Sequence, residues 1–382
     1  MRNQAVAFIG SVAAAAVAVC LSAGPLAAQA PKAAAAPAAK APAKPYAPPR
    51  TPDGHPDLQG VYDVATMTPV DRPSGANLIL TDKEAAALEE YEAQRQVKND
   101  APLKGDREAP PVGGDTSAPK SYLEILERAG GGVVGGYNNF WLAGGTTMIM
   151  VDGQKRSSLV VDPIDGKVPA MKAEARRRNA AFLAGAVAPD ANEGAGSGPP
   201  GAFDNPESRP LAERCLLGFG STSGPPTLPN YFYNNMKQIV QTPSSVMILN
   251  EMVHDARVVR MNSQHLPSSI PKWMGDSIGH WEGDALVIDT TNFTNKTQFR
   301  GSGDALHVIE RITRTGPRTL LYRFTVEDPE TWDKSWTGEY PWNATDENLY
   351  EYACHEGNYS LGGMLRGARA KEAEDAAKKT QK

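Results

Sequence analysis

The sequence predicts a mainly β protein, an antiparallel barrel or sandwich with an N-terminal helical arm. Short runs of alternating apolar and polar residues, separated by Gly and Asp, recur throughout the second half of the chain. The longest such stretch, residues 273–314, is typical of a meander of antiparallel strands. Helical patterns are strongest before residue 187. Polar residues on both faces of the strands favour a barrel with an occupied interior.

The N-terminus has the layout of a secretory signal peptide. Arg2 precedes an apolar run that ends in small residues at 24–30. The run is too short and too rich in Ala to favour a retained membrane anchor. We expect a signal peptide over residues 1–28 and a periplasmic or secreted protein. Residues 29–50, rich in Ala and Pro, are expected to be a disordered linker.

The first folded segment is expected to combine helices with a few strands. Thr81 and Glu84 have capping-box spacing at the start of a helix over 81–97. Asp152-Gly153 lies between two apolar runs, 146–151 and 157–161, and predicts a hairpin turn. A second helix is expected over 174–186.

The second half carries most of the expected strands. These lie at 237–242, 246–252, 256–261, 284–289, 306–314, 319–327 and 349–354. A Gly- and Pro-rich linker at 187–205 is expected to separate an α+β segment, 51–186, from a barrel domain, 206–365. Residues 366–382 are expected to form a charged tail.

Charge and cysteine content narrow the class of function. The net charge is -5 and acids and bases are interspersed, so no surface typical of nucleic-acid binding is predicted. Once the signal peptide is removed, only Cys215 and Cys354 remain, and in an oxidising compartment they are expected to form a disulfide. Closing a loop of that length contributes about 4 to 5 kcal/mol on the chain-entropy model. Thiol catalysis is not expected, because both cysteines would be consumed.

One candidate catalytic group lies in the run NEMVHDAR. On a continuous strand Asp255 and Arg257 share one face and His254 takes the other, so the three converge only if a bulge or turn intervenes. In that case His254 and Asp255 form a proton-transfer pair and Arg257 is the charge clamp. The alternative is an Asp255–Arg257 structural ion pair, with His254 capping a backbone group.

A second candidate lies on the strand expected at 306–314. His307 and Glu310 point to opposite faces of it, and the sequence does not decide which face is buried. The inward residue would supply an acid or base opposite the first group. Plain surface charges are the alternative.

Aromatic residues are candidates for binding a small hydrophobic or aromatic molecule. They are Tyr137, Trp141, Trp273 and Trp281. Trp281 lies in GHWEGD, which resembles a hairpin turn across which Trp281 packs, and core packing is the alternative use of Trp273.

A metal site is a further alternative. His254, His280 and His307 recur at nearly even intervals, and His355 with Glu356 would complete a tetrahedral set. No His-x-His or HExxH spacing is present, so we expect neither a metal nor a cofactor.

Several long motifs carry a family resemblance. They are PDLQGVY, YNNFW, RPLAERC, ILNEMVHDAR, WMGDSIGHWEGDALVIDTTNF and YEYACHEGNY. The chain resembles a widespread family of exported, largely uncharacterised bacterial proteins. The resemblance implies a secreted protein with a lipocalin-like or similar β-barrel, and it brings no catalytic residue.

The leading hypothesis is an enclosed barrel that binds a small hydrophobic or aromatic molecule and acts on it as a cofactor-independent lyase or isomerase. General acid and base steps would carry that reaction. A non-catalytic ligand-binding or envelope protein is the alternative, and a metal-dependent hydrolase is the second. No nucleic-acid partner and no membrane span after signal cleavage are expected, and the oligomeric state is open.

Overall fold

The structure is a computed structural model that describes residues 46–100, 144–186, 201–218, 224–230, 234–296 and 299–380. Residues 45–382 form one compact unit. The expected signal peptide, most of the expected linker, Tyr137 and Trp141 lie outside the described residues.

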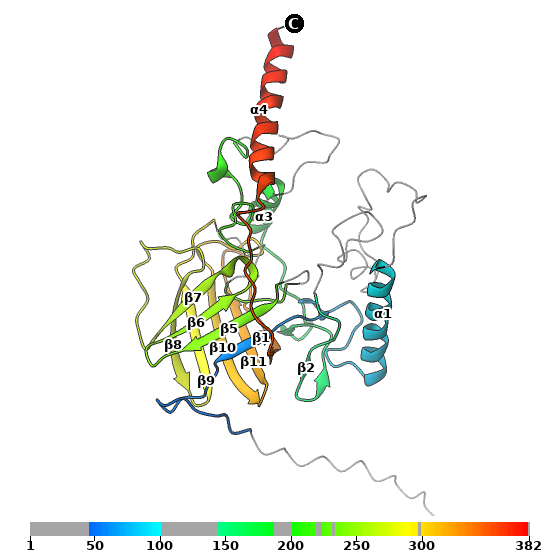
Figure 1. Cartoon of the computed structure of the whole chain (residues 1–382), viewed down its shortest axis with the longest axis vertical. Helices are drawn as coiled ribbons and strands as arrows, with labels where there is room; N and C mark the ends of the chain where they lie inside the picture. The colour runs from blue at the N-terminus through cyan, green and yellow to red at the C-terminus, as the bar shows by residue number, and fades with distance from the viewer. Residues whose placement is uncertain are drawn as a thin grey trace, which may run out of the picture. The chain divides into compact units, whose positions relative to one another are not determined.

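A closed barrel of nine strands confirms the predicted fold class (Figure 1). Around the barrel the strands run β1 (Gly60–Asp63), β5 (Met236–Gln241), β6 (Ser245–Asn250), β7 (Ala256–Met261), β8 (Asp276–Glu282), β9 (Ala285–Thr291), β10 (His307–Gly316), β11 (Thr319–Glu327) and β12 (Trp336–Ala344). β1 pairs with both β5 and β12 and so closes the barrel. Every neighbouring pair is antiparallel except β7 and β8. A short strand, β4 (Val160–Asp162), pairs with β12.

Local turn chemistry places the elements before the barrel as predicted. Helix α1 (Asp82–Asp100) starts with the expected capping box. The Thr81 backbone N–H donates to Glu84 Oε2 at 2.8 Å, and the Glu84 N–H donates to Thr81 Oγ1 at 3.2 Å. Asp152 and Gly153 adopt φ of 52° and 74° between β2 (Met150–Val151) and β3 (Gln154–Lys155), as a tight hairpin turn requires. The strand after the turn is β3 rather than the expected 157–161, the end of which belongs to β4.

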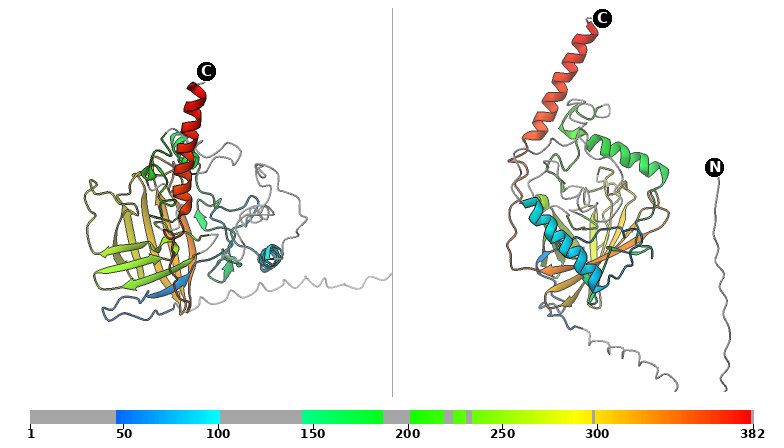
Figure 2. Two further views of the ribbon diagram at one scale, coloured as in Figure 1. Left: turned by 45° about the horizontal axis from the view of Figure 1, so that its top comes forward. Right: turned by 90° about the vertical axis from the view of Figure 1, so that its right-hand side faces the viewer.

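Two more helices lie in the described part of the chain, and one of them departs from the expected bounds. Helix α3 (Ala173–Ala186) confirms the second expected helix. Helix α4 (Tyr359–Thr380) takes up nearly all of the expected charged tail and begins before residue 366. Figure 2 shows α4 projecting from the rest of the compact unit. No helix within the described ranges is long and apolar enough to cross a membrane.

The strand expectations for the second half of the chain need three corrections. β8 and β12 are strands that the sequence analysis did not predict, and residues 349–354 do not form a strand. β12 was missed because Trp336 to Trp342 are buried without interruption, so the strand lacks the alternation that marks a half-buried one. β1 belongs to the barrel as well, so the barrel begins earlier than the expected boundary at residue 206.

Large side chains occupy the barrel interior. Tyr322, Phe324, Trp336, Tyr340 and Trp342 are fully buried. Ring centroids lie 4.9 Å apart for Tyr322 and Trp342, and 5.6 Å apart for Phe324 and Trp336. Such contacts stabilise a packed core beyond the area they bury. The centre of the barrel is therefore a core rather than the expected enclosed binding site.

A buried ion pair crosses this core. Arg257 Nη1 and Nη2 donate to the two carboxylate oxygens of Glu310 at 2.5 and 2.8 Å, and their side chains are 3% and 0% exposed. The Tyr322 hydroxyl donates to Glu310 at 2.7 Å. Burial alone lowers the pKa of Arg257, but the charge of Glu310 raises it above the ordinary value. Arg257 therefore keeps its positive charge inside the barrel.

A main-chain segment, residues 224–230, packs against the same core. The Thr227 N–H donates to the Tyr322 hydroxyl at 2.9 Å, and the Tyr340 hydroxyl donates to the Thr227 carbonyl oxygen at 2.7 Å. Both tyrosine hydroxyls thereby gain partners inside the barrel, as buried polar groups require.

Replacing Glu310 with Gln is expected to lower the free energy of unfolding by about 3 to 5 kcal/mol, because it leaves the Arg257 charge buried without a counterion. The matched control is Glu282→Gln, which breaks the Arg311–Glu282 pair on the outer face, where both side chains are more than 40% exposed. Urea unfolding of the two variants measures the difference. Equal, small losses in both would contradict a central role for the buried pair.

Candidate functional site

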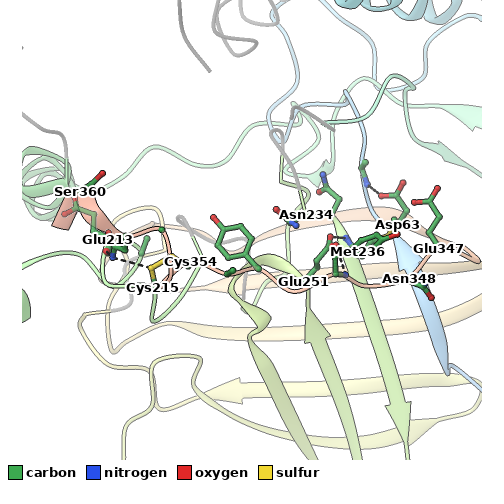
Figure 3. A pocket seen from close by; sticks show the side chains of 18 of the residues that line it. Asp63, Glu213, Cys215, Asn234, Met236, Glu251, Glu347, Asn348, Cys354 and Ser360 are labelled. Carbon is green, nitrogen blue, oxygen red and sulfur yellow. Dashed lines mark hydrogen bonds between the residues drawn. A yellow bond between two sulfur atoms is a disulfide. The ribbon is translucent and has the colours of Figure 1, made fainter. Parts of the chain in front are cut away.

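A groove at one end of the barrel is the candidate binding site (Figure 3). Its volume is about 880 Å³, and it lies where β1 ends and β5 begins. Figure 3 shows it running from Ser360 and the disulfide at one end to Asp63 and Glu347 at the other. The side chains that shape it come from the barrel rim, the segment 212–215 and the segment 347–364.

The floor of the groove depends on the turn between β6 and β7. This turn, Met252–His254, follows Glu251 and contains two left-handed residues, Val253 at φ 58° and His254 at φ 47°. A β-branched residue rarely adopts that conformation, so the surrounding structure must hold it there. The turn places Glu251, which is buried, against the groove.

Glu251 joins three segments of the chain. Its backbone N–H donates to the Met236 carbonyl oxygen at 3.0 Å, and its carboxylate accepts the Met236 N–H at 3.3 Å. The other carboxylate oxygen accepts the Tyr350 N–H at 3.4 Å. Glu251 therefore fixes both the first residue of β5 and the segment that forms the opposite wall.

A disulfide closes one end of the groove. Cys215 and Cys354 are bonded, with a Cα–Cα distance of 5.7 Å, which confirms the predicted pairing. Beside them, Asn358 Nδ2 donates to the Glu213 carbonyl oxygen at 2.7 Å. Disulfides are typical of proteins in oxidising compartments.

The groove is acidic and partly apolar. Four carboxylates line it, from Asp63, Glu213, Glu251 and Glu347, and no basic side chain belongs to its described lining. Arg209 pairs with Glu213 at 2.8 Å and neutralises one of the four. Methionine and tyrosine side chains, from Met236, Met364, Tyr350 and Tyr352, supply apolar surface. The arrangement disfavours anionic ligands and suits neutral or cationic ones.

The five predicted catalytic residues do not line this groove. Arg257 and Glu310 are brought together, but inside the barrel core. Asp255 is buried and accepts the Gly218 N–H at 3.2 Å, whereas His254 is exposed on the turn. His307 lies on the outer face of β10. A turn does interrupt the strands at NEMVHDAR, yet it orients Glu251 and does not bring His254, Asp255 and Arg257 together.

His307 belongs to a chain of polar contacts along the outer face of the barrel. Its Nδ1 lies 3.0 Å from Glu327 and its Nε2 lies 3.1 Å from Asp289. His265 lies 2.9 Å from the other oxygen of Asp289 and 3.3 Å from Asp276. The hydrogen bond to Asp289, with help from Glu327 and against burial, raises the pKa of His307 to about 9. His307 is therefore charged at neutral pH.

The remaining candidates also lie away from the groove. Trp281 stacks on His55 with ring centroids 4.9 Å apart, and Trp273 is 40% exposed. His280 contacts Glu282 at 3.0 Å. The turn predicted within GHWEGD is present at Gly283 and Asp284, between β8 and β9. In the part of the chain that the structure describes, no group of three His, Cys, Asp or Glu side chains is placed to hold a metal ion.

Sequence reasoning missed most of the groove. Asp63, Met236 and Glu347 were not singled out, and Tyr350 and Tyr352 were assigned to a strand. The available signal was the motif YEYACHEGNY next to Cys354, since a disulfide there ties a polar, aromatic segment to the rest of the chain.

No model of a known protein family matches the chain, and no curated protein matches it. The family resemblance of the motifs therefore stays a prediction.

The contacts of His307 predict a pH-dependent contribution to stability. Because its pKa is raised in the folded state, the contribution is fully present below the unfolded pKa near 6.5 and is lost as pH rises through about 9. His307→Gln should therefore destabilise the protein at about pH 6 and have little effect at about pH 10. Urea midpoints of wild type and variant across that range measure this, with the exposed His280→Gln as control. A pH-independent difference would contradict it.

Proposed function

We propose that the protein is an exported small-molecule-binding protein whose ligand occupies the groove at the barrel end. The observation that supports this most is the size of the groove, about 880 Å³. Binding sites for small molecules typically measure about 300–1,000 Å³. The Cys215–Cys354 disulfide and the contacts of Glu251 hold the groove walls together, which lowers the entropy cost of binding. The predicted signal peptide and this disulfide together support a periplasmic or secreted location.

The lining favours an amphiphilic ligand that is neutral or positively charged. An apolar or aromatic part would pack against Met236, Met364 and the two tyrosines. Hydroxyl or amine donors would bond to the carboxylates of Asp63 and Glu347. This keeps the expected hydrophobic or aromatic ligand but moves it from the centre of the barrel to its end.

Binding is a better account than acid–base catalysis by the predicted residues. General acids and bases must lie within hydrogen-bond reach of one bound molecule. Arg257 and Glu310 satisfy each other inside the core, and His307 is engaged by two carboxylates on the outer face. We therefore propose no lyase or isomerase step through His254, Asp255, Arg257, His307 or Glu310.

Filling the groove with a bulky side chain should abolish retention of the ligand. Met236→Trp adds bulk to the groove wall, whereas Val258→Trp adds the same side chain on the outer face of β7, where Val258 is 56% exposed. Each form is produced with its own leader, recovered from the exported fraction, and extracted for small molecules that mass spectrometry identifies. We expect a stoichiometric compound from wild type and Val258→Trp, and at least a tenfold lower amount from Met236→Trp, corresponding to about 1.4 kcal/mol or more of lost binding.

Two results would count against the proposal. One is equal retention of the compound in both Trp variants, which would place it elsewhere on the protein. The other is an extract from wild-type protein that contains no compound above the level of a protein-free control.

A further inference from the structure

The disulfide lies on the wall of the groove and not in the packed interior of the barrel. Cys215 and Cys354 both belong to the groove lining, and Figure 3 shows their sulfur atoms at the end of the groove that holds Ser360. The large hydrophobic cluster inside the barrel contains neither cysteine. Exposed disulfides are the ones that exchange readily with thiols, so a disulfide that faces a groove of about 880 Å³ is within reach of small molecules.

The two sulfur atoms of this bond have different surroundings. Cys215 is only 4% exposed, whereas Cys354 is partly exposed. Asn358 Nδ2 donates a hydrogen bond to Cys215 Sγ at 3.4 Å. A donor in that position stabilises the negative charge that a sulfur gains when its S–S bond breaks. Cys354 is therefore the sulfur open to attack, and Cys215 is the better leaving group.

The chain around Cys354 can move without breaking the barrel. Residues 345–358 contain neither helix nor strand. Hydrogen bonds tie this segment to Glu251, through the Tyr350 N–H at 3.4 Å, and to the Glu213 carbonyl oxygen, through Asn358 Nδ2 at 2.7 Å. Opening the disulfide therefore requires a displacement of the groove wall, while the pairing of the nine barrel strands stays as it is.

We propose that the Cys215–Cys354 disulfide is an exchange site for small thiols that enter the groove. Neutral and positively charged thiols are preferred, because four carboxylates and no basic side chain face the groove from the described residues. The inference goes beyond the proposed function, since it needs the groove but does not need a ligand that stays bound in it.

The exchange step balances without a further reactant. The thiolate of the entering molecule attacks Cys354 Sγ and forms a new S–S bond. The bond between Cys354 and Cys215 breaks, and Cys215 leaves as a thiolate that accepts the Asn358 hydrogen bond. The sulfur of the entering thiol is oxidised and that of Cys215 is reduced. The product is a mixed disulfide on Cys354.

Two small thiols of opposite charge test the proposal on the folded wild-type protein. Cysteamine carries an ammonium group, and 3-mercaptopropionate carries a carboxylate. Their exchange rates are measured at equal thiolate concentration, and each is divided by the rate of the same thiol with 2-hydroxyethyl disulfide, an uncharged reference. We expect a normalised rate at least fivefold higher for cysteamine, and a smaller difference in about 1 M salt, which screens the carboxylates.

Peptide mapping identifies the sulfur that is attacked. Short reactions with cysteamine are quenched with excess iodoacetamide, which alkylates any free thiol. We expect cysteamine on Cys354 and the alkyl group on Cys215, since the more exposed sulfur is attacked and the other one leaves.

A matched pair of variants tests entry through the groove. Ser360→Trp adds bulk at the end of the groove that holds the disulfide. Ala370→Trp adds the same side chain at an exposed position of the same helix, outside the groove lining. We expect exchange with cysteamine to be at least fivefold slower in Ser360→Trp and to change less than twofold in Ala370→Trp.

Three results would overturn the proposal. They are exchange only at urea concentrations that unfold the protein, cysteamine attached mainly to Cys215, and equal normalised rates for the two thiols. Loss of a retained compound in Met236→Trp does not depend on the reactivity of the disulfide, so the proposed function would survive any of the three.

Discussion

The buried pair of Arg257 and Glu310 is the interaction on which the rest of the structure depends. It joins β7 to β10 across the barrel, and Tyr322 on β11 bonds to the same carboxylate. Ser277 on β8 lies 3.4 Å from Arg257 and 2.9 Å from Thr290 on β9, so one network touches five neighbouring strands. Transferring two charges from water to the protein interior costs several kcal/mol of free energy per ion, about what good geometry and additional hydrogen bonds must offset.

This network, together with the packed aromatic rings, determines where a ligand can bind. Side chains occupy the centre of the barrel, which leaves the acidic groove at its end as the proposed binding site for a small molecule. A single short segment connects the two regions: Glu251 faces the groove, and Arg257, just beyond the β6–β7 turn, enters the core. The strained residues Val253 and His254 make this change of direction possible.

Local rules of sequence predicted part of the molecule well. The capping box at Thr81 and Glu84 and the Asp152-Gly153 turn depend on neighbouring residues only, so their chemistry is visible in the sequence. The Cys215–Cys354 pair followed from composition, because only two cysteines remain after the predicted leader. The buried face of each strand could not be predicted in the same way. Period-two alternation separates His307 from Glu310 but does not say which one is buried.

The groove required information that a sequence pattern does not hold. It forms where Asp63, Met236 and Glu347, far apart in the chain, meet at the barrel end. β12 was not predicted because both of its faces are buried, so its sequence lacks the alternation of apolar and polar residues. The burial of Lys237 on β5 could not be predicted either, because a lone lysine in an alternating strand is usually exposed.

The most direct test of this account is a crystal structure of the protein soaked with a brominated, uncharged aromatic such as 4-bromobenzyl alcohol. The anomalous signal of bromine locates the bound ligand directly. We expect the peak in the groove, beside Met236 and Tyr350, with the Arg257–Glu310 pair intact. A peak inside the barrel among Tyr322, Phe324 and Trp336, with those rings displaced, would contradict the account.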